Sequence, residues 1–289
     1  MSRYNTQPTY KRQRFLLAFI CQLDSSVSSI DLQKLVFLYS MKNSADYYEF
    51  IPYKYGAYSF QLAEDVDILR RDGYLADEGK GISATGEYPQ KVVYDIDAER
   101  GNNLIRKAYC EYPYFTINSE LTNKIFHGVE EKELFSKEKL KYNQTGRILF
   151  TIGYEGRSIE AFINTLIING IKLLCDVRKN PLSRKFGFSK GKLEHITGTA
   201  GIKYIHIPDL GIESDKRSNL ENAEDYMVLF DNYKKTLPDL DTHINWVYSL
   251  LCSNARVALM CYEREATMCH RHVIRDYITD AHGVKSVDL

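Results

Sequence analysis

From residue 147 onward the sequence alternates between short, nearly continuous apolar runs and amphipathic segments. The apolar runs are "RILFTIGY", "IKLLCDVR", "IKYIHIPDLG" and "RVALMC", and "GVKSVDL" is a candidate fifth run. Helical patterns such as "SIEAFINTLIING" and "CHRHVIRDYITDA" separate them. Apolar strands joined by helices are typical of a parallel sheet that helices cover on both faces. We therefore predict an α/β domain over residues 147–289, with the strand order left open.

The first hundred residues follow a different pattern. Helical spacing around Leu16, Leu35 and Leu69 predicts three helices, and the glycine-rich "YLADEGKGISATGEY" after them predicts a hairpin. Three helices followed by a hairpin indicate a winged helix-turn-helix domain over residues 1–100. Residues 101–146 are interpreted as a helical connector. Between the second and third helices, the segment "FIPYKYGAYS" resembles one found in the Panacea family of antitoxin-associated domains.

Two interpretations of this N-terminal domain stay open. Basic side chains suited to nucleic-acid contact are Lys11, Arg12, Arg14, Lys54, Arg70, Arg71 and Lys80. The third helix also carries Glu64, Asp65 and Asp67, which would repel phosphates if they faced a duplex. The alternative is a scaffold for protein contacts or for a homodimer.

The composition limits the partners. Thirty-eight basic residues balance thirty-eight acidic ones, so any contact with a polyanion must be local. The N-terminus has no apolar signal region and no run approaches a membrane span, so we expect no membrane partner. Six cysteines without regular spacing indicate reduced thiols and a cytoplasmic protein.

Chemistry-bearing residues gather where the predicted parallel strands end. Ligands of open parallel sheets bind beyond the carboxyl ends of the strands. The motifs at those ends are "GYEGR", "DVRKNPLSR", "HIPDLG" and "CYERE". We expect the following side chains to converge on one rim of the sheet: Tyr154, Arg157, Asp176, Arg178, His206, Asp209, Cys261 and Glu263.

Four segments carry a family resemblance. "TIGYEGRSIEAF", "CDVRKNPLSRKFGF", "GIKYIHIPDLG" and "VALMCYEREATMCHR", in this order and spacing, resemble the family called domain of unknown function 488. The resemblance covers residues 148–287. Tyr154 stands where that family usually has a histidine. The resemblance implies a fold and the place of a site but no reaction, and the cofactor stays unknown.

The catalytic candidates are two acids and a thiol. Asp176 and Glu263 are suited to general acid–base catalysis or to metal-assisted hydrolysis, although Asp176 could instead cap the next segment or pair with Arg178. Cys261 ends a strand before a helix, where a thiol pKa can fall. The acids that follow it disfavour its thiolate, so a buried, apolar-like cysteine is the alternative.

Anion binding is predicted at the basic loop 178–192, where Phe186 and Phe188 interleave with cations as in single-strand nucleic-acid sites. A solvated basic loop is the alternative. Arg271 opens the last helix, a favourable place for a phosphate. The predicted phosphate- or nucleic-acid-binding residues are Arg157, Arg178, Ser183, Arg184, Lys185, His206, His270 and Arg271.

Zinc is the weaker interpretation. Cys261, Cys269, His270 and His272 include two ligand types, but no CxxC or HxxxH pair, so no metal site is predicted. The sequence favours an enzyme that hydrolyses a glycosidic or phosphodiester bond in a nucleic acid or nucleotide, targeted by the winged helix. The alternatives are a non-catalytic nucleotide sensor and a Cys261-based enzyme similar to rhodaneses or phosphatases.

Overall fold

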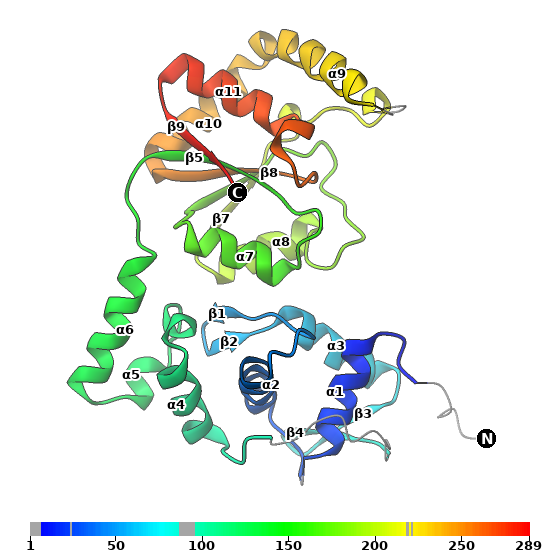
Figure 1. Ribbon diagram of the computed structural model, residues 1–289, viewed down its shortest axis with the longest axis vertical. Coiled ribbons are helices and arrows are strands. Elements are labelled where there is room, and N and C mark those ends of the chain that lie inside the picture. Colours follow the sequence, from blue (N-terminus) through cyan, green and yellow to red (C-terminus); the bar gives the residue numbers. More distant parts are fainter. Residues whose placement is uncertain (1–6, 24, 87–95, 218–219, 221) are drawn as a thin grey trace. The chain divides into compact units, whose positions relative to one another are not determined.

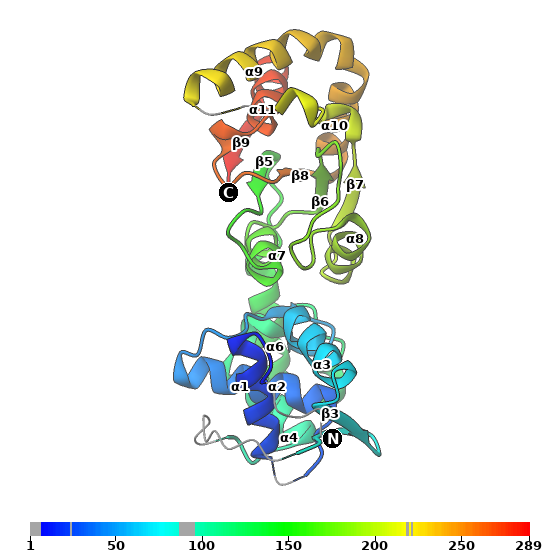
Figure 2. The ribbon, with the colours of Figure 1, turned by 90° about the vertical axis from the view of Figure 1, so that its right-hand side faces the viewer.

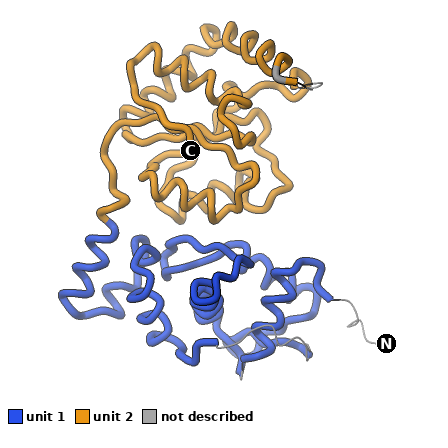
Figure 3. Tube along the Cα trace, viewed as in Figure 1, with its two compact units in different colours: residues 1–139 blue, residues 140–289 orange. Residues whose placement is uncertain are grey.

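The computed structural model describes residues 7–23, 25–86, 96–217, 220 and 222–289. The chain forms two compact units, residues 1–139 and residues 140–289 (Figure 3). None of the helices within the described ranges has the length and apolar character needed to cross a membrane.

The second unit is built on a five-stranded parallel sheet (Figure 1). Its strands are β5 (Ile148–Gly153), β6 (Leu173–Asp176), β7 (Lys203–His206), β8 (Arg256–Cys261) and β9 (Lys285–Asp288). They lie in the order β7-β6-β8-β5-β9, and every pairing is parallel. The predicted α/β fold with a parallel sheet and flanking helices is therefore confirmed, including its fifth strand.

Helices cover both faces of this sheet (Figures 1 and 2). One face carries α7 (Ile159–Ile168) and α8 (Lys190–Thr199), and the other carries α9 (Ala223–Thr236), α10 (Asp241–Asn254) and α11 (Arg271–His282). Side chains cap the N-termini of two of these helices. The Ser158 side chain accepts from the Ala161 amide at 2.9 Å at the start of α7, and Asn222 with Asp225 forms a capping box at the start of α9.

Strand alternation assigns each strand-end side chain to one face. Cys175, Leu259 and Cys261 lie in the apolar core shared with residues of α9, α10 and α11. Because successive side chains of a strand point to opposite faces, Asp176 points to the face that α7 and α8 cover. This alternation decides which of the predicted site residues can meet.

The connection after β8 leads to the opposite face of the sheet from the connections after its two neighbours. After β5 and β6 the chain passes to the face of α7 and α8, and after β8 it passes to the face of α11. β8 lies between β5 and β6, so the loops of adjacent strands diverge on both sides of its carboxyl end. Such a divergence is where open α/β sheets bind their ligands.

The first unit begins with two helices, α1 (Lys11–Cys21) and α2 (Ser29–Asn43). The hairpin β1 (Ile51–Tyr53) and β2 (Gly56–Tyr58) precedes α3 (Phe60–Arg71), and the hairpin β3 (Leu75–Glu78) and β4 (Gly81–Ala84) follows it. The first hairpin lies in the "FIPYKYGAYS" segment, for which the sequence predicted no hairpin. The last residues of the predicted wing, Glu87 and Tyr88, lie outside the described residues, and the winged-helix assignment stays a prediction.

Residues 101–139 complete the first unit. They form α4 (Gly101–Glu111), α5 (Thr122–Ile125) and most of α6 (Val129–Lys141). Their side chains Leu104, Tyr109, Phe126 and Phe135 are buried in the same core as Phe37 of α2. The structure thus makes this stretch part of the first unit, where the sequence suggested a separate connector reaching residue 146, because aromatic burial holds it against α2.

Candidate functional site

Asp176, at the end of β6, forms a buried ion pair with Arg178. The guanidinium Nε and a terminal nitrogen donate to the two carboxylate oxygens at 2.8 and 2.5 Å, and the Tyr204 hydroxyl donates to the carboxylate at 2.6 Å. Burial and the charge of Asp176 both raise the pKa of Tyr204. Both oxygens of Asp176 therefore have protein partners, and its side chain is fully buried.

Arg178 is equally enclosed. It also donates to the Tyr154 hydroxyl at 3.1 Å and to the Phe188 carbonyl at 3.0 Å. Burial alone would lower its pKa, but the hydrogen bonds and charge of Asp176 more than offset this and raise the pKa. Phe188 stacks on Tyr154 and packs edge-on against Phe162 of α7. On the α7 side of the rim, Asp176 and Arg178 are therefore hydrogen-bonded to other groups of the protein.

A second cluster lies at the end of β8, on the other face. Cys261, Cys269 and His270 are all buried, and their ligand atoms lie within 4.8 Å of one another. His270 Nδ1 is 3.9 Å from Cys261 Sγ and 3.8 Å from Cys269 Sγ. Its Nε2 lies 3.0 Å from the Val177 carbonyl oxygen, which only accepts hydrogen bonds. Nε2 therefore carries the ring proton of the neutral imidazole, and the Nδ1 lone pair faces the two sulfur atoms.

Burial and mutual contact shift the pKa values of Cys269 and His270. Burial and the neighbouring Cys261 raise the pKa of the Cys269 thiol well above its ordinary value. Burial alone would lower the pKa of His270, but contact with Cys269 raises it. A thiol in such surroundings stays protonated near neutral pH unless a cation replaces the proton.

A pocket of about 260 Å³ lies beside this cluster, between α9 and the loop from β8 to α11. Its lining consists of Ile212, Arg217, Leu220, Tyr226, Leu229, Phe230, Glu263, Met268, Cys269 and His270. Among the described residues, Glu263 Oε2 and Arg217 Nε are buried polar atoms with no hydrogen-bond partner. Buried polar atoms are almost always paired, so two of them, of opposite charge, in the walls of one pocket make this pocket the candidate site.

Arg271 holds the loop that carries Glu263. Its guanidinium donates to the Glu263 carbonyl at 2.6 Å, to the Arg264 carbonyl at 2.9 Å and to the Thr151 hydroxyl at 3.3 Å. The side chain is almost completely buried. The sequence predicted an anion receptor here, whereas in the structure the Arg271 guanidinium donates to two carbonyls of the site loop and to the Thr151 hydroxyl.

The two predicted acids do not meet. Asp176 points to the face of α7 and α8, where Arg178 and Tyr204 bind it, while Glu263 lines the pocket against α9. The two strand ends do lie on one rim, as the sequence predicted, but strand alternation points Asp176 to one face, and the loop after β8 turns Glu263 into the pocket on the other. The expectation of a cooperating carboxylate pair is corrected on this ground.

The predicted anion-binding residues are dispersed. Arg157 donates to the Thr165 hydroxyl at 3.1 Å, and burial together with the nearby Arg264 and Arg271 lowers its pKa. The His206 ring bonds the Arg178 carbonyl at 2.8 Å. Neither Arg157 nor His206 lines the pocket of Glu263, whereas His270, another of the predicted residues, does.

The basic loop after β6 keeps part of its predicted character. The Ser183 hydroxyl accepts from the Lys185 amide at 3.1 Å, and the Lys185 ammonium donates to the Tyr154 carbonyl at 3.1 Å. Arg184 is exposed. Phe188 belongs to the core and Phe186 is half-buried, so only the charges of this loop, and not Phe188, are presented to a ligand.

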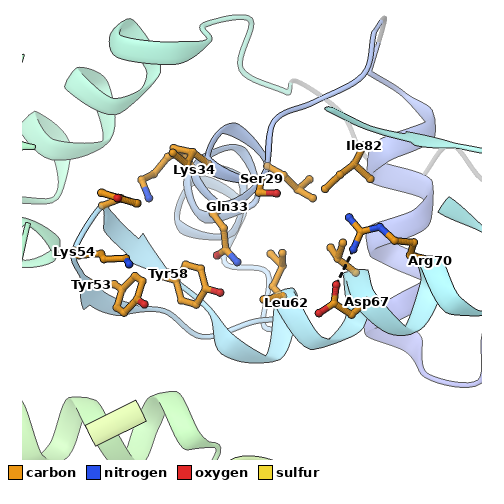
Figure 4. A pocket seen from close by; sticks show the side chains of 15 residues that line it. Ser29, Gln33, Lys34, Tyr53, Lys54, Tyr58, Leu62, Asp67, Arg70 and Ile82 are labelled. Atoms are coloured by element: carbon orange, nitrogen blue, oxygen red, sulfur yellow. Dashed lines mark hydrogen bonds and ion pairs between the residues drawn. The ribbon is translucent and has the colours of Figure 1, made fainter. Parts of the chain in front are cut away.

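The first unit has a pocket of its own, of about 350 Å³ (Figure 4). Lys34 lines it and donates to the Ala57 carbonyl at 2.7 Å, and burial lowers its pKa to about 7. Arg70 pairs with Asp67 at the other end of the pocket. Asp65, one of the acids expected to repel phosphates if they faced a duplex, is buried and bound by Arg12, so its charge does not face solvent.

Sequence reasoning missed Arg217, Tyr226 and Phe230. Arg217 lies in the polar segment "ESDKR" that follows the third strand-end motif, so extending the strand-end argument by a few residues would have included it. Tyr226 and Phe230 lie on α9, and nothing in their local pattern marks them. Only the packing of α9 beside the β8 loop reveals their place.

The second unit is thus a parallel α/β domain with a pocket at the diverging loops beside its central strand. Residues 158–278 match the model of a family described as domain of unknown function DUF488. The resemblance stated from the sequence motifs is confirmed for this half of the chain. No curated protein and no solved structure matches the chain.

Proposed function

We propose that the second unit is an enzyme acting on a nucleotide or on a nucleotide unit of nucleic acid, with the Glu263 pocket as its active site. One observation carries the proposal: a carboxylate oxygen and a guanidinium nitrogen are buried without partners in the same pocket. Arg217 is suited to a phosphate oxygen, and Glu263 is suited to general acid–base work in hydrolysis of a glycosidic or phosphodiester bond.

The other walls support a base-sized ligand. Tyr226 and Phe230 offer aromatic surfaces of the kind on which nucleobases stack. The pocket volume is about 260 Å³, which is below the roughly 300–1,000 Å³ of sites for drug-sized ligands. The pocket therefore suits a single nucleotide unit rather than a duplex.

The rest of the chain fits a wider proposal. The first unit would contact nucleic acid or a second copy of the chain through its basic side chains, and so deliver the substrate. A cytoplasmic location agrees with the six cysteines, which are all free thiols. The carboxylate reading is preferred to thiol chemistry because Cys261 lies in the apolar core.

The test compares Glu263→Gln with Glu265→Gln, whose side chain is exposed and outside the pocket. Nucleoside mono-, di- and triphosphates and a single-stranded oligonucleotide are the probes. We expect Glu263→Gln to bind the active probe but to lose turnover by about 10²–10⁴-fold, and Glu265→Gln to keep it. Arg217→Ala should weaken binding and its salt dependence, whereas Lys216→Ala, which removes the same charge outside this pocket, should not.

Three results would count against the proposal. The absence of binding to every probe at low salt would reject the ligand class. Binding without turnover would favour the nucleotide sensor. Full activity in Glu263→Gln together with its loss in Cys261→Ser would reject the carboxylate mechanism and favour one that depends on Cys261.

A further inference from the structure

We infer that Cys261, Cys269 and His270 form a zinc-binding site. The spacing of these residues in the sequence gave no reason to expect it, but the fold brings two sulfur atoms and one imidazole nitrogen within 4.8 Å of one another. Two thiolates and an imidazole are a preferred donor set for Zn²⁺. The inference stands independently of the substrate proposed above.

The distances suit the ion. Zn–S bonds of about 2.3 Å and Zn–N bonds of about 2.0–2.1 Å, at tetrahedral angles, separate the sulfur and nitrogen ligands by about 3.6 Å. The structure has 3.9 Å from Nδ1 to Cys261 Sγ and 3.8 Å from Nδ1 to Cys269 Sγ. A contraction of a few tenths of an ångström is therefore enough for both nitrogen–sulfur distances, and the two sulfur atoms lie within 4.8 Å of each other.

The orientation of His270 is the second, independent observation. Its Nε2 donates to the Val177 carbonyl, which leaves the Nδ1 lone pair directed at the sulfur atoms. Metal-binding histidines usually donate their other ring nitrogen to a carbonyl or carboxylate in this way, and that bond fixes the tautomer and the ring orientation. The Tyr233 ring packs edge-on against the imidazole and further restricts it.

Burial of the three side chains and the neighbouring pocket indicate how a metal would be retained and what role it would have. All three side chains are buried, so a bound ion is shielded from bulk solvent. Three protein ligands leave a fourth position, the arrangement of catalytic rather than structural zinc. Cys269 and His270 line the pocket that holds Glu263, so the fourth position opens to that pocket and to the carboxylate beside it.

The experiment uses the full chain, reduced and stripped with chelator, and titrates it with Co²⁺ as a spectroscopic substitute for Zn²⁺. We expect one equivalent to bind with thiolate-to-cobalt charge transfer and the visible bands of tetrahedral cobalt, and Zn²⁺ to displace it. Zn²⁺ should also raise the Tm, because it binds the folded chain.

Matched variants locate the site. Cys269→Ser should weaken metal binding by more than the roughly 10–100-fold that loss of an outer-shell partner costs. Cys252→Ser, which changes an exposed cysteine of α10, should leave it unchanged. If Cys269→Ser does not fold, the wild-type cobalt spectrum decides alone, because cobalt bound only by oxygen lacks the charge-transfer band.

The inference is overturned if the reduced wild-type chain shows no charge-transfer band, or if Cys269→Ser binds cobalt as tightly as the wild type and with an undiminished band. Glu263→Gln separates the two proposals, since it should retain the metal while losing turnover. Loss of the metal in Glu263→Gln would make the carboxylate a ligand and overturn the open fourth position. Metal binding without activity on any nucleotide would reject the proposed function and leave the zinc site intact.

Discussion

Lys34 and Asp176 are both buried ionisable side chains, but they differ in their binding partners. Asp176 keeps its ionic partner, because Arg178 binds both of its oxygens. Within the part of the chain that the structure describes, no carboxylate forms an ion pair with Lys34; its ammonium donates to the Ala57 carbonyl, and burial lowers its pKa to about 7. A buried pair stays charged, whereas a buried lysine without an ion pair gives up its proton.

Lys34 makes the stability of the first unit depend on pH. The lysine of the unfolded chain has a pKa of 10.5 and that of the folded chain about 7. Between these values the unfolded chain binds more protons, so this group makes stability rise with pH from about 7 to about 10.5. Below that window the folded chain must bury a charged ammonium, and the cost is largest.

Lys34→Met should therefore stabilise the protein near pH 6.5. The lowered pKa of Lys34 corresponds to a gain of several kcal/mol, at roughly 1.4 kcal/mol per pKa unit. Loss of the hydrogen bond to the Ala57 carbonyl reduces this gain by about 1 kcal/mol. The advantage should shrink as the pH approaches 10. Urea unfolding followed by circular dichroism at several pH values measures it. Lys42→Met, at an exposed site of the same helix, is the control; an advantage for Lys34→Met that does not change with pH would contradict the argument.

At the scale of elements, the site depends on how closely two loops approach. A Cβ added to Gly153, the last residue of β5, would lie 1.8 Å from the Glu263 carbonyl oxygen and 2.6 Å from its carbonyl carbon. The neighbouring amides of Tyr154 and Glu155 both donate to the Tyr262 carbonyl. The end of β5 thus supports the backbone that presents Glu263, and only glycine leaves room for it.

Gly153→Ala should displace this loop and destabilise the protein by about 1–3 kcal/mol, as overpacking does elsewhere. The contact is with backbone, so no side-chain rotation relieves it. Thermal or urea unfolding measures the effect. Gly191→Ala, in α8 with open space around the new Cβ, should be neutral or slightly stabilising; equal stabilities of the two variants would show that the β5 end tolerates a side chain.

At the scale of the whole molecule, the family match and the folded unit have different boundaries. The match covers residues 158–278, whereas the compact unit covers residues 140–289. The difference includes β5, which pairs with β8 along six residues and with β9 along four, and contributes Leu149, Phe150 and Ile152 to the buried interior. A fragment limited to the match loses an inner strand of the sheet.

We expect residues 140–289 to fold as an independent fragment and residues 158–278 not to fold. Without β5, one edge of β8 and the apolar faces on both sides of it are uncovered, and unpaired buried strand groups are costly. Amide chemical-shift dispersion and cooperative unfolding distinguish the two fragments. A well-dispersed, cooperative 158–278 fragment would show that β5 is dispensable.

Much of the second unit followed from the sequence. Parallel strands buried on both faces must be apolar along their length, so the sequence predicted strands at "RILFTIGY" and "RVALMC". The end of "RVALMC" then gave the position of the loop that carries Glu263. Helix caps such as Ser158 were equally legible, because capping depends on neighbours in the chain. In the first unit, local periodicity found α1, α2 and α3 but not the role of residues 101–139.

What only the tertiary structure decided depends on contacts between distant residues. The strand order put β8 between β5 and β6, and the register then sent Asp176 and Cys261 to opposite faces, so Asp176 was paired within the protein and Glu263 was left at a pocket. The turn between β8 and α11 brought His270 onto Cys261, and α9 added Tyr226 and Phe230 to the pocket wall. Sequence determines periodicity and local capping because these act over a few residues; which side chains share a site is decided by the packing of strands and helices, whose energies come from the whole core.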